Sequence, residues 1–298
     1  MSKSNIKLTG NDMTFTIVNY TFLTICLLVV LYPLVYILSS SFSSAEAVIS
    51  SRVWLFPVDP SLMGYQAVFR NSQIWTGYMN SAFYTFFGTI ISVILTIMAG
   101  YPLSKRDFYG RNLIMGLFTF TMLFSGGLIP YYLVIKNLNI LDTRWAMLLP
   151  NAMAVWNVII ARTYFQNTIP EELAEAAELD GCSDSAFIFR VVVPLSGPII
   201  AVMVLFYAVG QWNSYFDAMI LLKNNNLFPL QIILRNILIQ NQIDPNMIVD
   251  VKILLRNQGM KDLLKYSLIV VASAPVLALY PFVQKYFIKG IMVGAIKG

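Results

Sequence analysis

Long stretches without a charged side chain dominate this sequence and restrict the folds open to it. A helix that crosses a membrane needs about 20 mostly apolar residues, and several uncharged stretches reach that length. The chain is 57% hydrophobic and 12% charged, whereas soluble domains carry about 25% charged residues. We therefore predict an all-α membrane protein in which residues 1–298 form one transmembrane domain. Its six predicted spans are 14–38, 77–103, 112–135, 145–161, 197–222 and 265–288.

The first and fourth predicted spans have features that allow another interpretation. Lys3 and Lys7 precede the first span, as they would in a signal peptide. Its apolar core is longer than the roughly 7–15 residues of such a leader, so we expect a retained span. The fourth span is short and is flanked by Arg144 and Arg162. We expect both arginines to extend their charged ends toward the membrane surface.

The distribution of Lys and Arg predicts the orientation of the chain. An even number of spans places both termini on one side of the membrane, and cytoplasmic loops carry an excess of Lys and Arg. When the long connection 218–265 is left out, the side of the termini has ten such residues and the other side has four. Lys105, Arg106 and Arg111 lie close together on the richer side. We therefore predict cytoplasmic termini.

The long connection 218–265 contains a further amphipathic segment. From Pro229 onward, apolar residues follow helical spacing at Leu230, Ile233, Leu234, Ile237 and Leu238. We expect a helix that lies on the outer membrane surface. A helix that packs on a partner or acts as a lid is the alternative.

Several kinds of active site are excluded by the composition. The chain has no histidine, which removes histidine general bases and Ser-His-Asp triads. It also lacks a Gly-x-x-x-x-Gly-Lys-[Ser/Thr] loop for nucleotide phosphates, so we expect no ATP site, cofactor or metal in this chain. Ionisable residues are nearly absent from the spans, whereas ion-coupled carriers keep such groups near the membrane centre. An ion-coupled secondary sugar transporter and a membrane-embedded enzyme are therefore disfavoured alternatives.

A polar segment at 171–198 separates two apolar stretches and is the most informative part of the chain. Asn167 or Thr168 is a candidate cap for a helix that begins there. The helix is predicted to end at Gly181, because glycine adopts a positive φ at low cost. The small or apolar positions at helical spacing are Leu173, Ala176 and Ala177. A polar helical loop between spans predicts a docking surface for a soluble partner, and an ordinary amphipathic loop is the alternative.

The spacing within this segment resembles a known family. The pattern E-A-A-x3-G-x9-I-x-L-P of binding-protein-dependent ABC importer permeases is matched by Glu175-Ala176-Ala177, Gly181 and Val191-Val192-Val193-Pro194. The departures are Val for Ile and Val for Leu, which keep the apolar character. The resemblance implies a type I importer permease fold with six transmembrane helices and a coupling-helix loop at 167–197. In that family the loop docks on a cytoplasmic ATPase subunit.

Other segments extend the resemblance over most of the chain. Similarity to the carbohydrate-uptake branch, which includes the maltose permease subunits, is carried by residues 54–57, 64–65, 100–104 and 212–217 and by the tail YPFVQKYFIKGIMVGAIKG. The overall pattern is most similar to the subgroup for lipo-oligosaccharide or complex-polysaccharide uptake. The resemblance therefore implies a permease in a bacterial cell membrane (inner or plasma) that imports an oligosaccharide or polysaccharide fragment.

The same resemblance implies which partners and residues take part. The partners are a second permease subunit, two cytoplasmic ATPase subunits that hold ATP and Mg, an extracytoplasmic solute-binding protein and membrane lipid, with no role for nucleic acid. The implied ATPase-docking residues are Glu171, Glu172, Glu175, Ala176, Ala177, Asp180, Gly181, Pro194, Lys289, Gly290 and Gly294. Residues 289–298 are expected to reach the ATPase interface as an extended tail, and a basic anchor at the inner lipid surface is the alternative.

A cluster of polar and aromatic residues at 211–217 predicts a substrate route. Amides and a carboxylate can hydrogen-bond sugar hydroxyls, and aromatic rings can stack on sugar faces. The candidate residues are Gln211, Trp212, Asn213, Tyr215 and Asp217. On a helix, residues 211 and 215 would share one face. Aromatic anchoring at the membrane interface and packing between helices are the alternative.

Overall fold

The computed structural model describes the backbone of residues 10–240 and 251–295, with side chains over 12–238 and 259–281. Every regular element in these ranges is a helix, which confirms the all-α prediction. The chain divides into two compact units, each built from two separate stretches of sequence. The first unit comprises Met1–Arg70 and Ile237–Val271, and the second comprises Asn71–Asn236 and Ala272–Gly298.

The first unit consists of α1 (Gly10–Ser41), α2 (Ala45–Ile49), α3 (Met63–Arg70) and the beginning of α15 (Val251–Ala295). Helix α1 is long and apolar, and its most apolar stretch is not buried within the protein. Such a surface is stable only against lipid or another protein. A small core of Ala47, Val48 and Val53 packs beside Tyr266 of α15. The ring of Tyr36 meets that of Tyr266 edge-on, with the centroids 5.8 Å apart.

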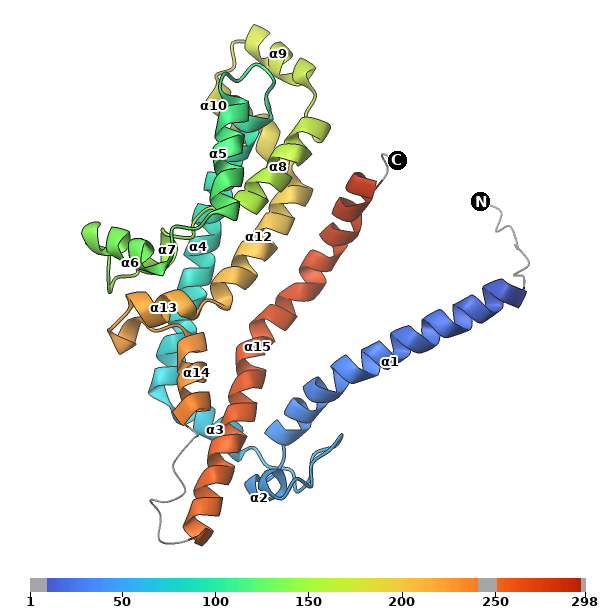
Figure 1. Cartoon of the computed structure of the whole chain (residues 1–298), viewed down its shortest axis with the longest axis vertical. Coiled ribbons are helices and arrows are strands. Elements are labelled where there is room, and N and C mark those ends of the chain that lie inside the picture. Colours follow the sequence, from blue (N-terminus) through green and yellow to red (C-terminus); the bar gives the residue numbers. More distant parts are fainter. Residues whose placement is uncertain (1–9, 241–250, 296–298) are drawn as a thin grey trace. The chain divides into compact units, whose positions relative to one another are not determined.

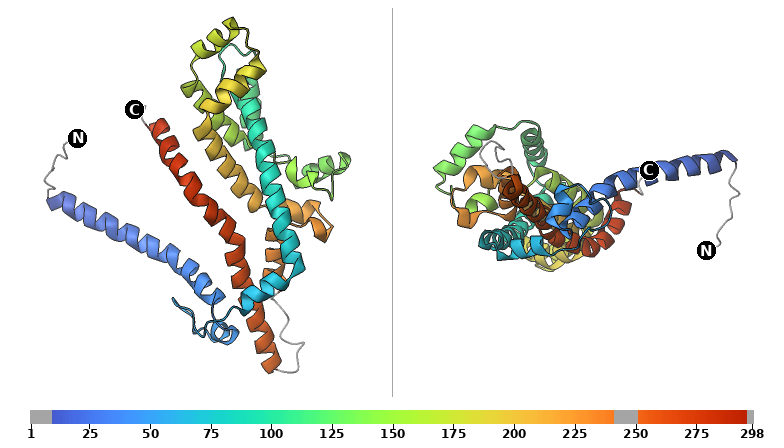
Figure 2. Two further views of the ribbon diagram at one scale, coloured as in Figure 1. Left: turned by 180° about the vertical axis from the view of Figure 1, so that it is seen from behind. Right: turned by 90° about the horizontal axis from the view of Figure 1, so that it is seen from below.

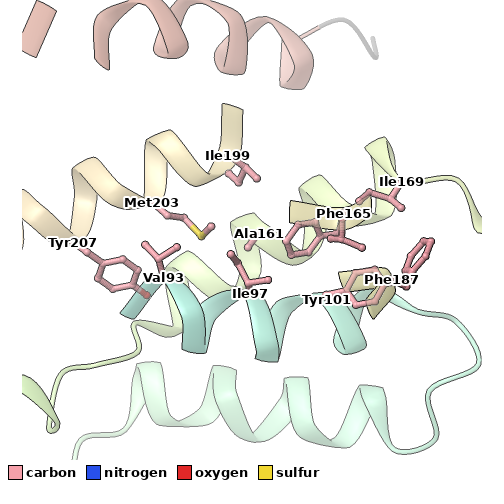
Figure 3. Close-up of a cluster of buried hydrophobic side chains, with 11 residues drawn as sticks. Val93, Ile97, Tyr101, Ala161, Phe165, Ile169, Phe187, Ile199, Met203 and Tyr207 are labelled. Carbon is pink, nitrogen blue, oxygen red and sulfur yellow. The ribbon is translucent and has the colours of Figure 1, made fainter. Parts of the chain in front are cut away.

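The centre of the second unit is formed by α4 (Ser72–Ser104), α8 (Val155–Thr168) and α12 (Gly197–Trp212). These helices lie side by side in Figure 1 and in the view from behind in Figure 2. Residues four apart share one face of a helix, and both α4 and α12 place an apolar residue at every fourth position. Together with α8 and the following loop they enclose one cluster of Val93, Ile97, Tyr101, Ala161, Phe165, Ile169, Phe187, Val192, Ile199, Met203 and Tyr207 (Figure 3).

Two arginines near α8 contact protein groups, and their place relative to the membrane surface stays a prediction. The last carbonyls of a helix have no partner within that helix. Arg162 donates through Nε to the carbonyl oxygen of Leu103 at the end of α4, at 2.9 Å. The guanidinium of Arg144 lies over the ring of Phe83, 4.3 Å from its centroid. Because α4 supplies both contacts, the arginines fasten it to the chain around α8.

The predicted span 112–135 is not one helix in the structure. It is divided between α5 (Arg111–Leu123) and α6 (Leu128–Asn137), which are bent by 116° at the break. Pro130 stands in the first turn of α6, where a missing N–H is tolerated. The same proline cannot continue a helix that arrives from α5, because its ring clashes with the carbonyl four residues earlier.

The predicted span 145–161 is interrupted for a related reason. Helix α7 (Trp145–Leu148) ends before Pro150, and α8 begins only at Val155. Proline has no N–H to donate within a helix. Just before α8, the backbone N–H of Ala154 donates to the hydroxyl oxygen of Tyr207 in α12, at 3.1 Å. The helical part therefore lies later in the chain than predicted and continues to Thr168.

The predicted span 197–222 also contains a break. Helix α12 ends at Trp212, and α13 (Phe216–Leu221) begins after a short connection. The side-chain amide of Asn213 donates to the carbonyl oxygen of Val209 at 2.9 Å. Such local bonds compete with the helix and favour its end. The remaining elements of this unit are α9 (Glu171–Leu179), α10 (Asp184–Phe187), a π-helical turn (Ile188–Val192), α11 (Val193–Leu195), a 3₁₀ turn (Asn225–Leu227), the start of α14 (Leu230–Gln240) and the part of α15 from Ala272 onward.

The start of α14 packs on α4, and its predicted place on the outer membrane surface stays a prediction. Its first residue, Leu230, is buried, and the backbone N–H of Leu230 donates to the hydroxyl oxygen of Ser81 at 2.8 Å. The side-chain amide of Asn80 donates to the carbonyl oxygen of Asn226 at 2.7 Å. The helical segment after Pro229 was therefore predicted correctly, and of its predicted apolar face Leu230 and Ile233 are buried whereas Leu238 is exposed.

The number of spans stays a prediction. In the described parts of the chain, three helices are long and apolar enough to cross a membrane, namely Asp12–Ser41, Ser72–Ser104 and Gly259–Pro281. Two bent pairs meet the same criteria when each pair is counted as one, which allows up to five. The second pair joins Asp184–Leu195 to α12 at an angle of 85°.

The contact between α3 and α15 can be tested by a substitution at Gly64. A Cβ atom there would lie 3.0 Å from the carbonyl oxygen of Leu263 and would collide with the side chain of Ser267. We predict that Gly64→Ala destabilises the protein by about 1–3 kcal/mol through overpacking. Gly116→Ala is the control, because a Cβ atom there meets nothing within 4 Å. Equal melting temperatures of the two variants in detergent would contradict the contact.

Candidate functional site

Helix α9 is the core of the candidate docking loop and begins at Glu171. Its N-cap is Pro170, which makes no side-chain capping bond. The predicted caps are wrong, because Thr168 is the last residue of α8 and the Asn167 amide donates back to the carbonyl oxygen of Thr163 at 2.9 Å. Glu171 and Glu172 stand in the first turn, where carboxylates interact favourably with the positive end of the helix dipole.

The C-terminus of α9 is closed by a turn that requires glycine. Gly181 has a φ of +71°, which confirms the predicted positive φ. Its N–H donates to the carbonyl oxygen of Glu178 at 2.9 Å, and the N–H of Cys182 donates to that of Ala177 at 2.9 Å. This pair of bonds is the Schellman motif. The chain therefore reverses sharply after α9 and leads directly into α10.

The small or apolar positions that the spacing predicted are divided between two sides of α9. Ala174 and Ala177, three residues apart, pack against the cluster shared by α4, α8 and α12. Ala176 is exposed on the other side together with Leu173. Consecutive residues point about 100° apart on a helix, so Ala176 and Ala177 cannot share one face. Leu179 is 90% exposed at the end of the helix and was not singled out in the sequence.

The connection after α4 borders α9 and adds residues that the sequence analysis did not assign to this site. A groove of about 570 Å³ lies between residues 101–109 and α9. The ammonium group of Lys105 lies 5.3 Å from the centroid of the Tyr101 ring and 5.9 Å from that of Phe187. Arg106 forms an ion pair with Glu171 at 3.5 Å, and both side chains are too exposed for this pair to contribute much. The cluster of basic residues at 105–111 is the sequence feature that could have assigned this connection to the site.

The groove contains only part of the predicted docking set. Among the described residues that line it are Glu171, Ala174, Glu175, Ala177, Glu178 and Asp184. Glu172, Ala176, Asp180 and Gly181 are exposed outside its lining. Pro194 lies on α11, beyond the π-helical turn, and is exposed but also outside the groove. The predicted residues therefore occupy two sides of α9.

The predicted docking tail is helical along most of its length. Helix α15 continues to Ala295, so residues 289–295 are not extended as predicted. A helix rises about 1.5 Å per residue, less than half the rise of an extended chain. The side chain of Lys289 and the surroundings of Gly290 and Gly294 lie outside the described residues, as do residues 296–298.

A second candidate site is a cavity of about 420 Å³ between α7, α8, α12 and α13. Four of the five predicted substrate residues line it, namely Gln211, Asn213, Tyr215 and Asp217. They meet there because α12 stops at Trp212 and the chain turns before α13, not because they share a helix face. The other lining residues are Met147, Asn151, Ala154, Asn157, Phe206, Tyr207, Gly210, Ser214 and Phe216.

Asp217 is held in the cavity by two hydrogen bonds from distant parts of the sequence. Asn151 donates through Nδ2 to Asp217 Oδ2 at 2.7 Å. The hydroxyl of Tyr131 donates to Asp217 Oδ1 at 3.2 Å. A carboxylate has about four acceptor positions, so two remain for a ligand. No local pattern linked residues 131, 151 and 217, and only the tertiary contact reveals the set.

Trp212 is the exception among the predicted substrate residues. It is 5% exposed and is absent from the described lining of the cavity. Its indole N–H donates to the carbonyl oxygen of Ala272 at 3.0 Å. Its ring meets that of Tyr78 edge-on, with centroids 5.5 Å apart. The alternative that was weighed for this residue, packing between helices, is the one that the structure supports.

Comparison with known proteins finds a matching family and similar proteins for this chain. Residues 92–293 match the family model described as binding-protein-dependent transport system inner membrane component. The chain is 40% identical over 285 residues to the polygalacturonan/rhamnogalacturonan transport system permease protein YtcP of Bacillus subtilis (strain 168), covering 95% of this chain and 98% of that protein. It is 39% identical over 296 residues to protein LplC of the same organism, covering 95% of each.

A solved structure agrees with the sequence relatives. It is described as a bacterial ABC transporter involved in the import of the acidic polysaccharide alginate, and it matches with a TM-score of 0.85 and 37% identity. The match covers 94% of this chain and 98% of that chain. These findings confirm the resemblance that residues 175–194 indicated, together with the type I importer permease fold, and they replace the ion-coupled alternative. The chain belongs to the family of inner-membrane components of binding-protein-dependent transport systems.

Proposed function

We propose that this chain is the permease subunit of an ATP-driven importer that takes up an oligosaccharide or a polysaccharide fragment. Its partners are a second permease subunit, two cytoplasmic ATPase subunits that hold ATP and Mg, and an extracytoplasmic solute-binding protein. The similarity to YtcP and to the alginate importer over almost the whole chain carries this proposal. Our proposal assigns ATP hydrolysis to the ATPase subunits and substrate passage to the permease pair.

The candidate docking loop has the geometry needed to receive force from an ATPase subunit. The outer side of α9 is exposed and carries Leu173, Ala176 and Leu179, whereas its inner side packs on the cluster of α4, α8 and α12. Close-packed side chains transmit displacement because they have little free volume. The same cluster includes Tyr207, which lines the cavity beside α13. A movement of α9 would thus reach the cavity through continuous packing.

The cavity beside α13 has the chemistry of a sugar contact. Its lining combines amide side chains, a carboxylate and exposed aromatic rings. Sugar hydroxyls donate and accept hydrogen bonds, and the apolar faces of sugar rings stack on aromatic side chains. We include Asn151 and Asn157, which the sequence analysis did not identify, and exclude Trp212, which is committed to packing.

We propose that α9 faces the cytoplasm, with both termini, and that the 3₁₀ turn at 225–227 faces outside. Ser183 caps α10 and Asn225 lies in the 3₁₀ turn, so α12 separates them in the chain. In a variant without Cys26 and Cys182, Ser183→Cys and Asn225→Cys are expected to react with a membrane-impermeant thiol reagent from opposite sides of intact cells. Labelling of both positions from the same side would rule out this topology.

We predict that the turn after α9 is essential for coupling. Gly181→Val forces a β-branched residue into a positive φ, which costs roughly 1–2 kcal/mol, and it should lower ATP-driven sugar uptake at least tenfold in the assembled importer. Gly181→Asn is the matched control, because asparagine tolerates this conformation. Glu175→Ala should weaken docking more mildly, since an exposed ion pair contributes little.

Two measurements separate loss of coupling from loss of folding in these variants. Membrane insertion is followed by the amount of each variant recovered in the membrane fraction. Coupling is followed by the ATPase rate and by sugar uptake in proteoliposomes. Normal uptake by both Gly181→Val and Glu175→Ala at normal expression would show that the loop is not the docking element.

A further inference from the structure

The cavity beside α13 contains a carboxylate, and this charge affects which sugars the cavity can bind. Among the described residues that line it, Asp217 is the one ionisable carboxylate, and none is Lys or Arg. The other polar groups are the amides of Asn151, Asn157, Gln211 and Asn213, together with hydroxyl groups. The lining therefore combines hydrogen-bonding groups with apolar surface, and no Lys or Arg among its described residues offsets the negative charge.

The carboxylate of Asp217 is fixed in position by the bonds from Asn151 and Tyr131. Neither donor carries a positive charge, so the two bonds orient the carboxylate without neutralising it. Its unused acceptor positions suit the hydroxyl groups of an uncharged sugar. A uronate carboxylate has no proton to donate at neutral pH and would face a like charge.

We infer that this cavity favours uncharged sugar units over carboxylated ones, with Asp217 as the residue that determines this selectivity. The inference rests on the proposed function, because it requires the cavity to lie on the sugar route. Two like charges roughly 8 Å apart in a partly hydrated cavity repel enough to lower occupancy about tenfold. We therefore predict that this chain differs, in the charge of the sugar units it accepts, from the relative described as importing an acidic polysaccharide.

The charge selectivity can be measured without any sugar. Ser214 lines the cavity and is replaced by cysteine in an assembled importer whose subunit lacks Cys26 and Cys182. Methanethiosulfonate reagents of similar size carry either a trimethylammonium or a sulfonate group, and their rates are corrected for reaction with a free thiol. We expect the cationic reagent to react at least tenfold faster than the anionic one.

Substitutions at Asp217 test whether its carboxylate causes the difference between the two reaction rates. Asp217→Asn should bring the corrected rate ratio close to one, whereas Asp217→Glu, the matched control, should keep it. Asn213→Asp adds a second carboxylate and should widen the ratio, which provides an independent variant if Asp217→Asn does not fold. A ratio that does not respond to Asp217→Asn or to Asn213→Asp, or a cysteine that reacts with neither reagent, would overturn the inference.

Uptake of sugars by the complete importer links the selectivity to transport. A neutral oligosaccharide and a uronate-bearing one of the same length are compared in the unmodified protein and in Asp217→Asn. The solute-binding protein is the same in both, so its own preference cancels from the change in the uptake ratio. We expect Asp217→Asn to raise the relative uptake of the uronate-bearing sugar about tenfold.

The outcomes distinguish the two levels of the proposal. If no oligosaccharide is taken up while the thiol rates follow the charge at Asp217, the proposed sugar import is wrong and the negative cavity stands. If sugars are taken up but their ratio does not change in Asp217→Asn, sugar import stands and the assignment of Asp217 as the selectivity residue is wrong.

Discussion

The packing of α4 against α8 and α12 is the contact on which the second unit depends. Apolar residues at every fourth position of α4 and α12 meet in one buried cluster with α8. Inside the same contact, the hydroxyl groups of Thr96 and Tyr207 are 2.6 Å apart, and Tyr207 also accepts the N–H of Ala154. In a membrane, where lipid is as apolar as the side chains, such close packing and polar pairing hold helices together.

Both candidate sites are built on the ends of this contact. Figure 3 shows the cluster extending from Tyr207 to Phe187. Tyr207 lines the cavity that holds Asp217, and Phe187 lies beside Lys105 and the inner side of α9. A substitution that loosens the cluster would therefore alter the position of both sites. This arrangement gives a physical route by which a displacement of α9 would reach the cavity at the far end of α12.

Two exposed apolar surfaces of the protein differ in kind. Helix α1 is apolar on all sides, with exposed residues along most of its length, as expected for a surface covered by lipid or another membrane helix. The exposed side of α9 combines Leu173 and Leu179 with carboxylates. A mixed surface of that kind suits a soluble partner with polar groups of its own. The different composition of these two surfaces therefore indicates different neighbours, lipid or a membrane helix for α1 and a soluble partner for α9.

Composition and spacing in the sequence determined the broad class of this protein. Long uncharged stretches required helices in a membrane, because a spanning backbone must satisfy its own hydrogen bonds. The spacing from Glu175 through Gly181 to Pro194 identified the family and predicted the position of a docking loop. The positive φ at Gly181 was also predictable, since few other residues stop a helix in that conformation.

Tertiary structure decided how those segments are divided and which residues meet. Pro130 and Pro150 interrupt stretches that hydropathy alone treats as single spans, because hydropathy does not register a missing N–H. Trp212 and Asp217 belong to one predicted cluster. The indole N–H of Trp212 donates to the carbonyl oxygen of Ala272, whereas Asp217 lines a cavity. Asp217 has its partners at positions 131 and 151. Contacts between residues so far apart in the chain depend on how helices pack, and no local pattern carries that information.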